Sequence, residues 1–233
     1  REAALSVLKG RTLPVIATCR LKADGGKFSG SEAVRRKALE AAVKAGAGWV
    51  DLELGSLGWK PEGARVIGSV HDLEGMPEDA AGLLRKILAA GADVAKLAAT
   101  PHTLREAKAL LDLNALVPGR VSAFGMGPVG IPTRLLAGCA GAWAVYAASD
   151  IGPAAAPGQI PLSEMLFPFR FREVTASTCL FGLIGNPVAQ SPGPWAHTVA
   201  MRLAGIRGLY LPLPASDAAD ARWALRGFGL QGA

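Results

Sequence analysis

Residues 65–98 read RVIGSVHDLEGMPEDAAGLLRKILAAGADVAKLA, and this stretch decides the fold class. It begins with a short run rich in β-branched residues, Arg65–His71, and ends with a second apolar run, Val94–Ala98. Between the two runs, four apolar residues share one face of a helical pattern: Leu83, Leu84, Ile87 and Leu88. Pro77 stands where a first-turn proline would, and Gly91 is placed to end the helix. A strand, a helix and a second strand in this order predict a parallel sheet covered by helices.

The same alternation extends along most of the chain. Six candidate strands share this short, apolar character: Pro14–Arg20, Trp49–Leu54, Arg65–His71, Val94–Ala98, Arg120–Met126 and Trp143–Ala147. Between the first two, Ser29 and Glu32 have the spacing of a capping box, and apolar positions recur over 33–43. Thr103 and Glu106 repeat that spacing before a further helix. Six such units with right-handed crossovers fit a (β/α)₈ barrel or an open doubly wound sheet, and periodicity alone does not choose between them.

The composition fits a globular protein that acts on a small anion. Half of the 233 residues are hydrophobic, which is enough apolar material for a sizeable core. The net charge of +6 comes from basic residues that are dispersed and not interleaved with aromatic residues. This argues against nucleic-acid binding and favours an anionic metabolite. The longest weakly polar run, Leu135–Ala148, is too short to span a membrane, so we expect no membrane association.

Cysteine usage and the first residues bear on the compartment. Three cysteines stand far apart, without metal-ligand spacing: Cys19, Cys139 and Cys179. This argues against a disulfide framework or a metal site and predicts a reducing compartment, which we interpret as the cytoplasm. Leu5–Lys9 followed by Gly10 is typical of the tail of a helix and not of a signal peptide. We therefore expect that the natural N-terminus lies further upstream.

The strand–helix rhythm stops after Gln159. Phe167–Thr178 mixes charge, proline and aromatic residues, as a connector does. A new apolar run, Cys179–Ile184, then predicts a strand. The predicted organisation is therefore a first domain over 1–166, a linker over 167–179 and a second, partial domain over 180–233.

Ionisable residues recur along the predicted strands. Arg20 closes the first strand, Glu53 lies near the end of the second, His71 ends the third, Lys96 lies within the fourth, and Arg134 follows the fifth. In barrels of parallel strands, the catalytic groups project from the carboxyl ends of several strands. These residues are therefore the candidates for chemistry.

Lys96 lies within an apolar segment, Val94–Ala99, that would bury its ammonium group. Burial beside another cation lowers the pKa of a lysine, and a neutral amine can attack a ketone to form an imine. The alternative is an exposed lysine of an edge strand, or a lysine paired with a carboxylate.

His71 and Glu53 are each ambiguous when taken singly. His71 precedes Asp72 and could be an ordinary surface residue, and the carboxylates of Asp51 and Glu53 share one face of their strand. Taken together, however, a carboxylate, an imidazole and an amine on successive strands could supply an orienting group, a base and a nucleophile.

Five segments then show a specific family resemblance. In order they are Val50–Leu54 (VDLEL), Ser69–Asp72 (SVHD), Gly91–Pro101 (GADVAKLAATP), Gly125–Gly138 (GMGPVGIPTRLLAG) and Ala156–Ile160 (APGQI). Their order and spacing resemble those of class I 3-dehydroquinate dehydratases, over about residues 12–166.

The resemblance implies roles for six residues. Lys96 would be the Schiff-base lysine and His71 the general acid and base, with Glu53 holding the imidazole. A further set would bind the substrate: Arg134 at the carboxylate, Gln159 beside it, and Arg20 at the ring hydroxyls. The alternatives are a surface salt bridge for Arg134 and a turn role for Gln159.

The implied reaction is a syn elimination of water from 3-dehydroquinate that gives 3-dehydroshikimate. The iminium is the electron sink, so the step is expected to require no metal and no nicotinamide cofactor. The implied fold is an α/β (β/α)₈ TIM barrel that lacks about two N-terminal strands. Open sheet edges would favour pairing with another chain, which makes a homo-oligomer an expectation.

A second resemblance begins near residue 180. Residues 185–197 (GNPVAQSPGPWAH) resemble the start of the substrate domain of shikimate dehydrogenases, with Ser191 as a possible shikimate-binding residue. Gly193 and Thr198 depart from that family's serine and asparagine, and the alternative is an ordinary strand–loop–helix entry. In that family the NADP-binding domain comes later in the chain, so NADP is expected only in a full-length parent.

Two other functions remain open from the sequence. A Schiff-base aldolase on a similar barrel also needs a lysine on a strand. A non-catalytic fragment could instead act by association through its open sheet edges or its partial shikimate site.

Overall fold

The computed structural model describes residues 12–188 and 190–233, and the expected helix tail at Leu5–Lys9 lies outside them. By its internal contacts, the chain divides into two units. The first comprises the described residues up to His71 together with 81–97, and the second comprises 72–80 and 98–233.

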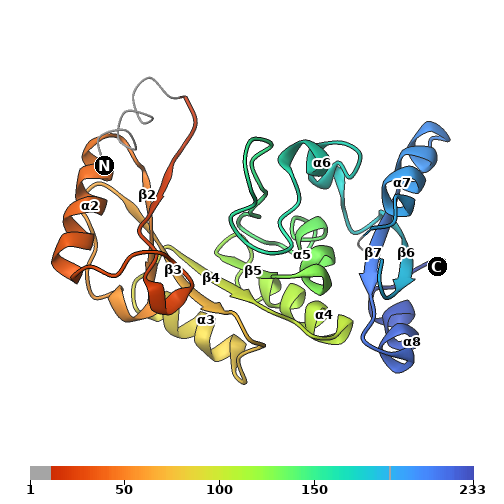
Figure 1. Cartoon of the computed structure of the whole chain (residues 1–233), viewed down its shortest axis with the longest axis horizontal. Coiled ribbons are helices and arrows are strands. Elements are labelled where there is room, and N and C mark those ends of the chain that lie inside the picture. The colour runs from red at the N-terminus through yellow and green to blue at the C-terminus, as the bar shows by residue number, and fades with distance from the viewer. Residues whose placement is uncertain (1–11, 189) are drawn as a thin grey trace. The chain divides into compact units, whose positions relative to one another are not determined.

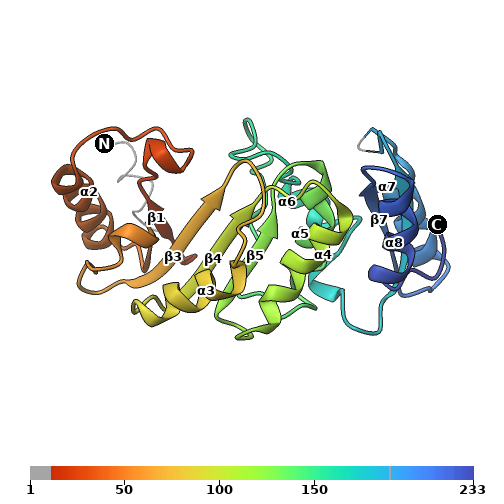
Figure 2. The same cartoon turned by 90° about the horizontal axis from the view of Figure 1, so that it is seen from below.

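Most of the first unit consists of the strands β1 (Ile16–Thr18), β2 (Trp49–Glu53), β3 (Arg65–Asp72) and β4 (Val94–Ala99), the helices α2 (Glu32–Lys44) and α3 (Ala80–Ala89), and the short 3-10 turns η1 (Lys22–Asp24) and η2 (Leu54–Ser56). The strands are adjacent in the order β1-β2-β3-β4, and Figure 2 shows β3 and β4 side by side. β1 pairs with β2 and β2 with β3 in parallel register, for example Ala17 opposite Val50. All six residues of β4 are buried, as expected for a strand covered on both faces. The expected parallel α/β sheet is confirmed.

The helices of the first unit begin later than the sequence predicts. The prediction of a capping box from Ser29 to Glu32 is wrong, because Ser31 is the N-cap residue and its side chain accepts a hydrogen bond from Val34 N. Similarly, α3 begins three residues after Pro77. Glu32 cannot serve as the third helical residue of a box because it is the first residue of α2.

The second unit contains β5 (Val121–Gly125), β6 (Cys179–Gly185), β7 (Gly208–Pro214), the helices α4 (Leu104–Asp112), α5 (Ile131–Leu135), α6 (Leu162–Leu166), α7 (Gly193–Leu203) and α8 (Ala218–Gly227), and the 3-10 turns η3 (Leu113–Ala115), η4 (Pro128–Gly130) and η5 (Phe171–Glu173). These elements are labelled in Figure 1. The capping box of Thr103 and Glu106 is confirmed at the start of α4. Buried Asn114 ties the end of this helical region to β5, because its side chain exchanges two hydrogen bonds with the backbone of Ala123.

The predicted strand Trp143–Ala147 is not formed. Trp143 N donates to Val121 O at 2.7 Å, as a strand neighbour of β5 would. The next residue, Ala144, forms hydrogen bonds with a side chain instead. Ser122 Oγ accepts from the N–H of Ala144 and donates to its carbonyl. A side chain therefore replaces the backbone ladder, and the segment stays irregular.

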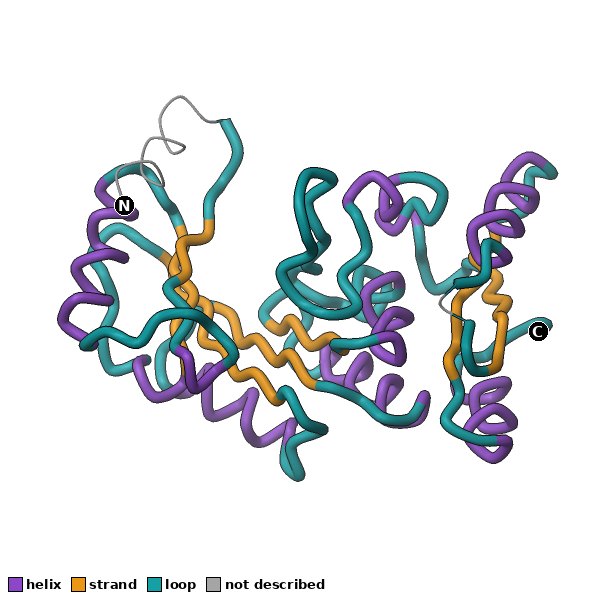
Figure 3. The backbone as a smooth tube through the Cα atoms, in the orientation of Figure 1, coloured by secondary structure: helices purple, strands orange, loops and turns teal. Residues whose placement is uncertain are grey.

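The predicted strand Cys179–Ile184 is confirmed as β6. It pairs in parallel with β7, and Figure 3 shows the two strands side by side. One buried apolar cluster contains residues on both sides of 167–179, including Leu104, Leu135, Leu209 and Leu213. The apolar core of the second unit therefore continues across the predicted linker 167–179. The division into domains stays a prediction. Within 12–188 and 190–233, no helix has the length and apolar character needed to cross a bilayer.

Candidate active site

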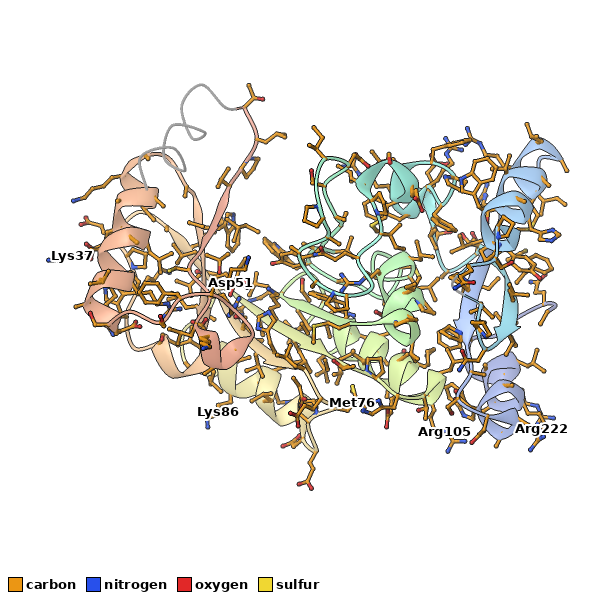
Figure 4. The ribbon with its side chains drawn as sticks, viewed as in Figure 1. Lys37, Asp51, Met76, Lys86, Arg105 and Arg222 are labelled. Carbon is orange, nitrogen blue, oxygen red and sulfur yellow. The ribbon has the colours of Figure 1, made fainter. Side chains whose placement is uncertain are left out.

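Asp51 lies at the centre of a buried polar cluster in the first unit. Its Oδ1 atom accepts hydrogen bonds from Arg20 Nη2 at 2.7 Å and from Ser69 Oγ at 2.5 Å. Its Oδ2 atom accepts one from Lys96 Nζ at 2.9 Å. In Figure 4, Asp51 points into the interior of its unit, among other side chains. Three donors from three different segments therefore converge on one carboxylate.

The environment of Asp51 keeps it ionised. Burial by itself would raise the pKa of Asp51, but the charges of Lys96 and Arg20 and the hydrogen bonds from Ser69 and Lys96 lower it to about 2. A carboxylate that stays charged at neutral pH can compensate the buried cations around it.

Lys96 is only 6% exposed. Its position at the middle of β4 explains this, because that strand is buried along its whole length. Of the alternatives open from the sequence, the exposed lysine is excluded, whereas pairing with a carboxylate is observed at Asp51. A buried ammonium group needs such a partner, and the partner keeps the nitrogen in one place.

His71 is neutral at physiological pH in this environment. Burial, followed by the charges of Lys96 and Arg20, lowers the pKa of His71 to about 3, against the opposing effect of Asp51. Its Nδ1 atom is buried and has no hydrogen-bond partner among the described residues. A neutral imidazole can accept a proton, which is the state required of a general base.

The depressed pKa of His71 predicts a loss of stability in mild acid. Below pH 6.5, the unfolded chain protonates His71, whereas the folded chain resists protonation down to about pH 3. The unfolded state therefore binds more protons in this window, and the free energy of unfolding should fall as the pH is lowered. Urea denaturation at neutral pH and at about pH 5 should show a smaller decrease for His71→Gln than for the wild type. An equal decrease in both proteins, with His102→Gln as control, would contradict this assignment.

The family resemblance implied that Glu53 holds the imidazole of His71, but the structure gives Glu53 other partners. One oxygen of Glu53 accepts from Leu21 N at 3.0 Å and pairs with Arg20 Nη1 at 3.1 Å. The other oxygen pairs with Arg35. Both oxygens are thus occupied by other donors, and the structure places Glu53 beside Arg20 instead.

Arg134 lies in the second unit, on α5, and is fully buried. Its Nη1 atom donates to Tyr146 O at 2.9 Å, and its guanidinium carbon lies 4.7 Å from the ring centroid of Phe124. Burial lowers the pKa of Arg134 to about 10. Its Nε and Nη2 atoms have no hydrogen-bond partner among the described residues. This excludes the surface salt bridge as an explanation for Arg134.

Two glycine-containing loops of the second unit meet next to α5. Gly127 N donates to Pro157 O at 3.1 Å. Gly158 has φ +76, and a Cβ atom there would lie 2.3 Å from Gly127 O, so only glycine fits this approach. Gln159 follows directly, but its Oε1 atom accepts from Ala155 N and Ala156 N, which is the turn role.

Ser191 lies in the second unit, two residues before the start of α7, and is exposed. Its Oγ atom accepts a hydrogen bond from Gly193 N at 3.1 Å. The structure therefore brings Lys96, Arg20 and Glu53 into one network in the first unit, whereas Arg134, Gln159 and Ser191 belong to the second.

Sequence reasoning missed Asp51, Ser69 and Arg35 as parts of this network. For Asp51 a signal was present, because it shares a strand face with Glu53. Ser69 and Arg35 gave no comparable signal, since serine on a strand and arginine on a charged helix are common surface residues.

Comparison with known proteins identifies the family of the chain. The family model "Type I 3-dehydroquinase" matches residues 2–175. The chain is 35% identical over 179 residues to a 3-dehydroquinate dehydratase of Dehalococcoides mccartyi, covering 73% of this chain and 79% of that protein. The crystal structure of 3-dehydroquinate dehydratase from Geobacillus kaustophilus matches with a TM-score of 0.62 at 25% identity, over 71% of this chain and 72% of that one.

A longer relative matches as well. The chain is 30% identical over 218 residues to the chloroplastic bifunctional 3-dehydroquinate dehydratase/shikimate dehydrogenase of Arabidopsis thaliana. That match covers 89% of this chain but only 36% of the plant protein. The family model covers well over half of the 233 residues, and the relatives agree with it. The chain therefore belongs to the type I 3-dehydroquinase family, whose reaction is the dehydration of 3-dehydroquinate in the shikimate pathway.

Proposed function

We propose that this chain dehydrates 3-dehydroquinate through an imine formed on Lys96. The observation that carries the proposal is the buried amine of Lys96, which is 6% exposed and lies 2.9 Å from Asp51 Oδ2. Its charge helps to lower the pKa of His71, so that the imidazole is neutral. A buried amine beside a neutral imidazole is the pair that imine chemistry followed by proton abstraction needs.

Formation of the imine requires that the ammonium group of Lys96 first loses its proton. Arg20 also binds Asp51, so the carboxylate shares its charge between two cations and holds Lys96 less strongly than an unshared partner would. The neutral amine attacks the C3 ketone of the substrate, and water leaves as the imine forms.

Elimination then depends on His71. The protonated imine makes the neighbouring C2 proton acidic, and the imidazole removes it while the electron pair moves to the imine nitrogen. The returning electron pair expels the C1 hydroxyl, which leaves as water after receiving the proton from His71. Hydrolysis of the new imine regenerates Lys96 and releases 3-dehydroshikimate.

Arg134 is proposed to bind the substrate carboxylate. Two of its buried nitrogens lack partners among the described residues, and a carboxylate can accept from an arginine through both of its oxygens. Gln159 and Arg20 complete the proposed contacts with the substrate, to its carboxylate and its ring hydroxyls respectively.

Substitution of Arg134 tests this proposed contact. We expect Arg134→Lys to raise KM for 3-dehydroquinate by about tenfold or more, because lysine keeps the charge but loses the bidentate geometry. Steady-state kinetics would measure the change, with Arg120→Lys as a control at an exposed arginine of the same unit. An unchanged KM in Arg134→Lys would remove Arg134 from the binding site.

The proposed reaction uses neither a metal nor a nicotinamide cofactor, since the iminium accepts the electron pair that a metal would otherwise stabilise. NADP belongs to the proposal only for a longer parent protein. We further propose that the parallel strands belong to a (β/α)₈ barrel, which the similarity to the Geobacillus enzyme supports.

The segment 180–233 is proposed to be the start of a shikimate dehydrogenase substrate domain. Its elements follow the order β6, α7, β7 and α8, and Phe181 of β6 also bridges Gly232 in parallel. A match over 89% of the chain to the bifunctional Arabidopsis protein necessarily extends beyond residue 175, which supports the same assignment. Ser191 is the proposed shikimate contact. The proposed location is the cytoplasm, where the three separate cysteines would stay reduced.

Product analysis tests the proposed function against the aldolase alternative. The chain is incubated with 3-dehydroquinate, and the products are identified by mass spectrometry. We expect a single product that has lost one water and kept all of its carbon atoms. Two smaller carbonyl fragments would instead indicate aldol cleavage and would overturn the assignment.

A further inference from the structure

Arg35 is a fully buried arginine that the proposed chemistry does not use. It lies in the first turns of α2, close to Lys37, which Figure 4 shows pointing away from the unit. Burying a guanidinium without partners is costly, so its contacts indicate what it is for.

Every nitrogen of the Arg35 side chain has a partner. Nε donates to Cys19 O at 2.8 Å, and Nη1 donates to Glu32 Oε2 and to Ser56 Oγ, each at 3.0 Å. Nη2 pairs with Glu53 Oε2. Arg35 thus joins the loop after β1, the turn after β2 and its own helix.

These contacts hold the main chain on both sides of Arg20. Cys19, whose carbonyl Arg35 holds, immediately precedes Arg20 in the chain. Glu53, the carboxylate that Arg35 holds, binds the backbone N–H of Leu21 at 3.0 Å and Arg20 Nη1 at 3.1 Å. Arg35 therefore fixes the main chain before Arg20 directly, and the main chain after it through Glu53.

The position of Arg20 in turn affects the amine. Arg20 Nη2 lies 2.7 Å from Asp51 Oδ1, and Asp51 Oδ2 lies 2.9 Å from Lys96 Nζ. The charge of Arg35 also helps to keep Arg20 in place, because it balances the negative charge of Glu53. Among the described residues, the cations paired with Glu53 are Arg35 and Arg20. Without Arg35, the buried carboxylate of Glu53 would therefore compete for Arg20 with Asp51 and the substrate.

We propose that Arg35 is a positioning residue that sets Arg20, and through it Asp51 and Lys96, for binding of 3-dehydroquinate. This inference rests on the proposed function of Lys96 and Arg20. Lysine cannot replace Arg35 in this role, since one ammonium group cannot reach a carbonyl and a carboxylate on different segments in the planar fork geometry.

Kinetics of two variants test the proposal. We expect Arg35→Met and Arg35→Lys to lower kcat/KM by about tenfold to 10²-fold, mainly through a higher KM, because displaced binding groups weaken substrate positioning. Arg36→Met is the matched control on the same helix, because Arg36 contacts Glu32 and the Trp59 ring but not Glu53. We expect the control to keep the kinetics of the wild type.

A double-mutant cycle separates positioning from general stability. If Arg35 acts through Arg20, Arg35→Met should change kcat/KM by less than about twofold in an Arg20→Met background, since the group that it positions is absent. If Arg35→Met does not fold, Arg35→Lys serves in the same cycle. Additive losses, or single variants with the kcat/KM of the wild type, would overturn the proposal.

The failure of this inference can be told apart from the failure of the proposed function. Borohydride trapping with 3-dehydroquinate is measured on the wild type and on Arg36→Met beside each kinetic experiment. Absence of trapping and turnover in both would refute the imine mechanism itself. Trapping and turnover in both, together with additive losses in the cycle, would refute only the role of Arg35.

Discussion

Replacing Lys96 with alanine is expected to remove turnover of 3-dehydroquinate altogether. The methyl side chain cannot form an imine, so the C2 proton loses the electron sink that makes it acidic. We expect a loss beyond about 10⁴-fold, which is the upper end of what acid–base catalysis alone contributes. The measurement is the rate of appearance of 3-dehydroshikimate under saturating substrate.

Lys86→Ala provides the control for this experiment. Lys86 lies on the exposed face of α3 and points away from the unit in Figure 4. Its substitution should leave turnover unchanged. Turnover of Lys96→Ala at the level of Lys86→Ala would remove Lys96 from the mechanism.

Replacing His71 with alanine is expected to slow turnover by about 10²–10⁴-fold while the imine still forms. The imidazole moves protons in the elimination, whereas the attack on the ketone belongs to Lys96. The variant should therefore accumulate an intermediate that borohydride can trap. Comparison of trapped protein with turnover rate measures the two steps separately.

His102→Ala is the appropriate control, because His102 is exposed and its ring forms a hydrogen bond with the backbone carbonyl of Glu74. It should turn over and trap like the wild type. Full turnover by His71→Ala would show that another group moves the proton.

The strand–helix–strand unit over 65–98 could be predicted because several local signals agree there. The apolar period changes from that of a strand to that of a helix and back, and Gly91 has the positive φ of 90° that its position after α3 requires. Agreement of this kind makes element type more predictable than element ends. The starts of α2 and α3 show the limit, since each lies a few residues from its predicted place.

The failure at Trp143–Ala147 has a different cause. The apolar pattern of that segment is compatible with a strand, but the outcome depends on Ser122, which lies more than twenty residues away in the sequence. Its hydroxyl competes successfully for the backbone of Ala144. No local pattern contains that information.

In the candidate site, too, local motifs could be predicted from the sequence, whereas long-range contacts could not. The family motifs indicated Lys96 and His71, and burial on β4 agrees with the expected desolvated amine. The resemblance assigned Glu53 to the imidazole of His71. In the structure Glu53 pairs with Arg20 and Arg35, and it is Asp51, two residues earlier on β2, that pairs with Lys96. Long-range contacts, such as that of Arg35 with Glu53, cannot be inferred from spacing along one strand.

The central claim is that Lys96 forms a covalent imine with 3-dehydroquinate. The most direct test treats the wild-type chain with 3-dehydroquinate and borohydride, digests it and locates the added mass by peptide mass spectrometry. We predict one reduced adduct, on Lys96 within the β4 peptide. No adduct, or an adduct on another lysine such as Lys60 or Lys108 with Lys96 unmodified, would contradict the account.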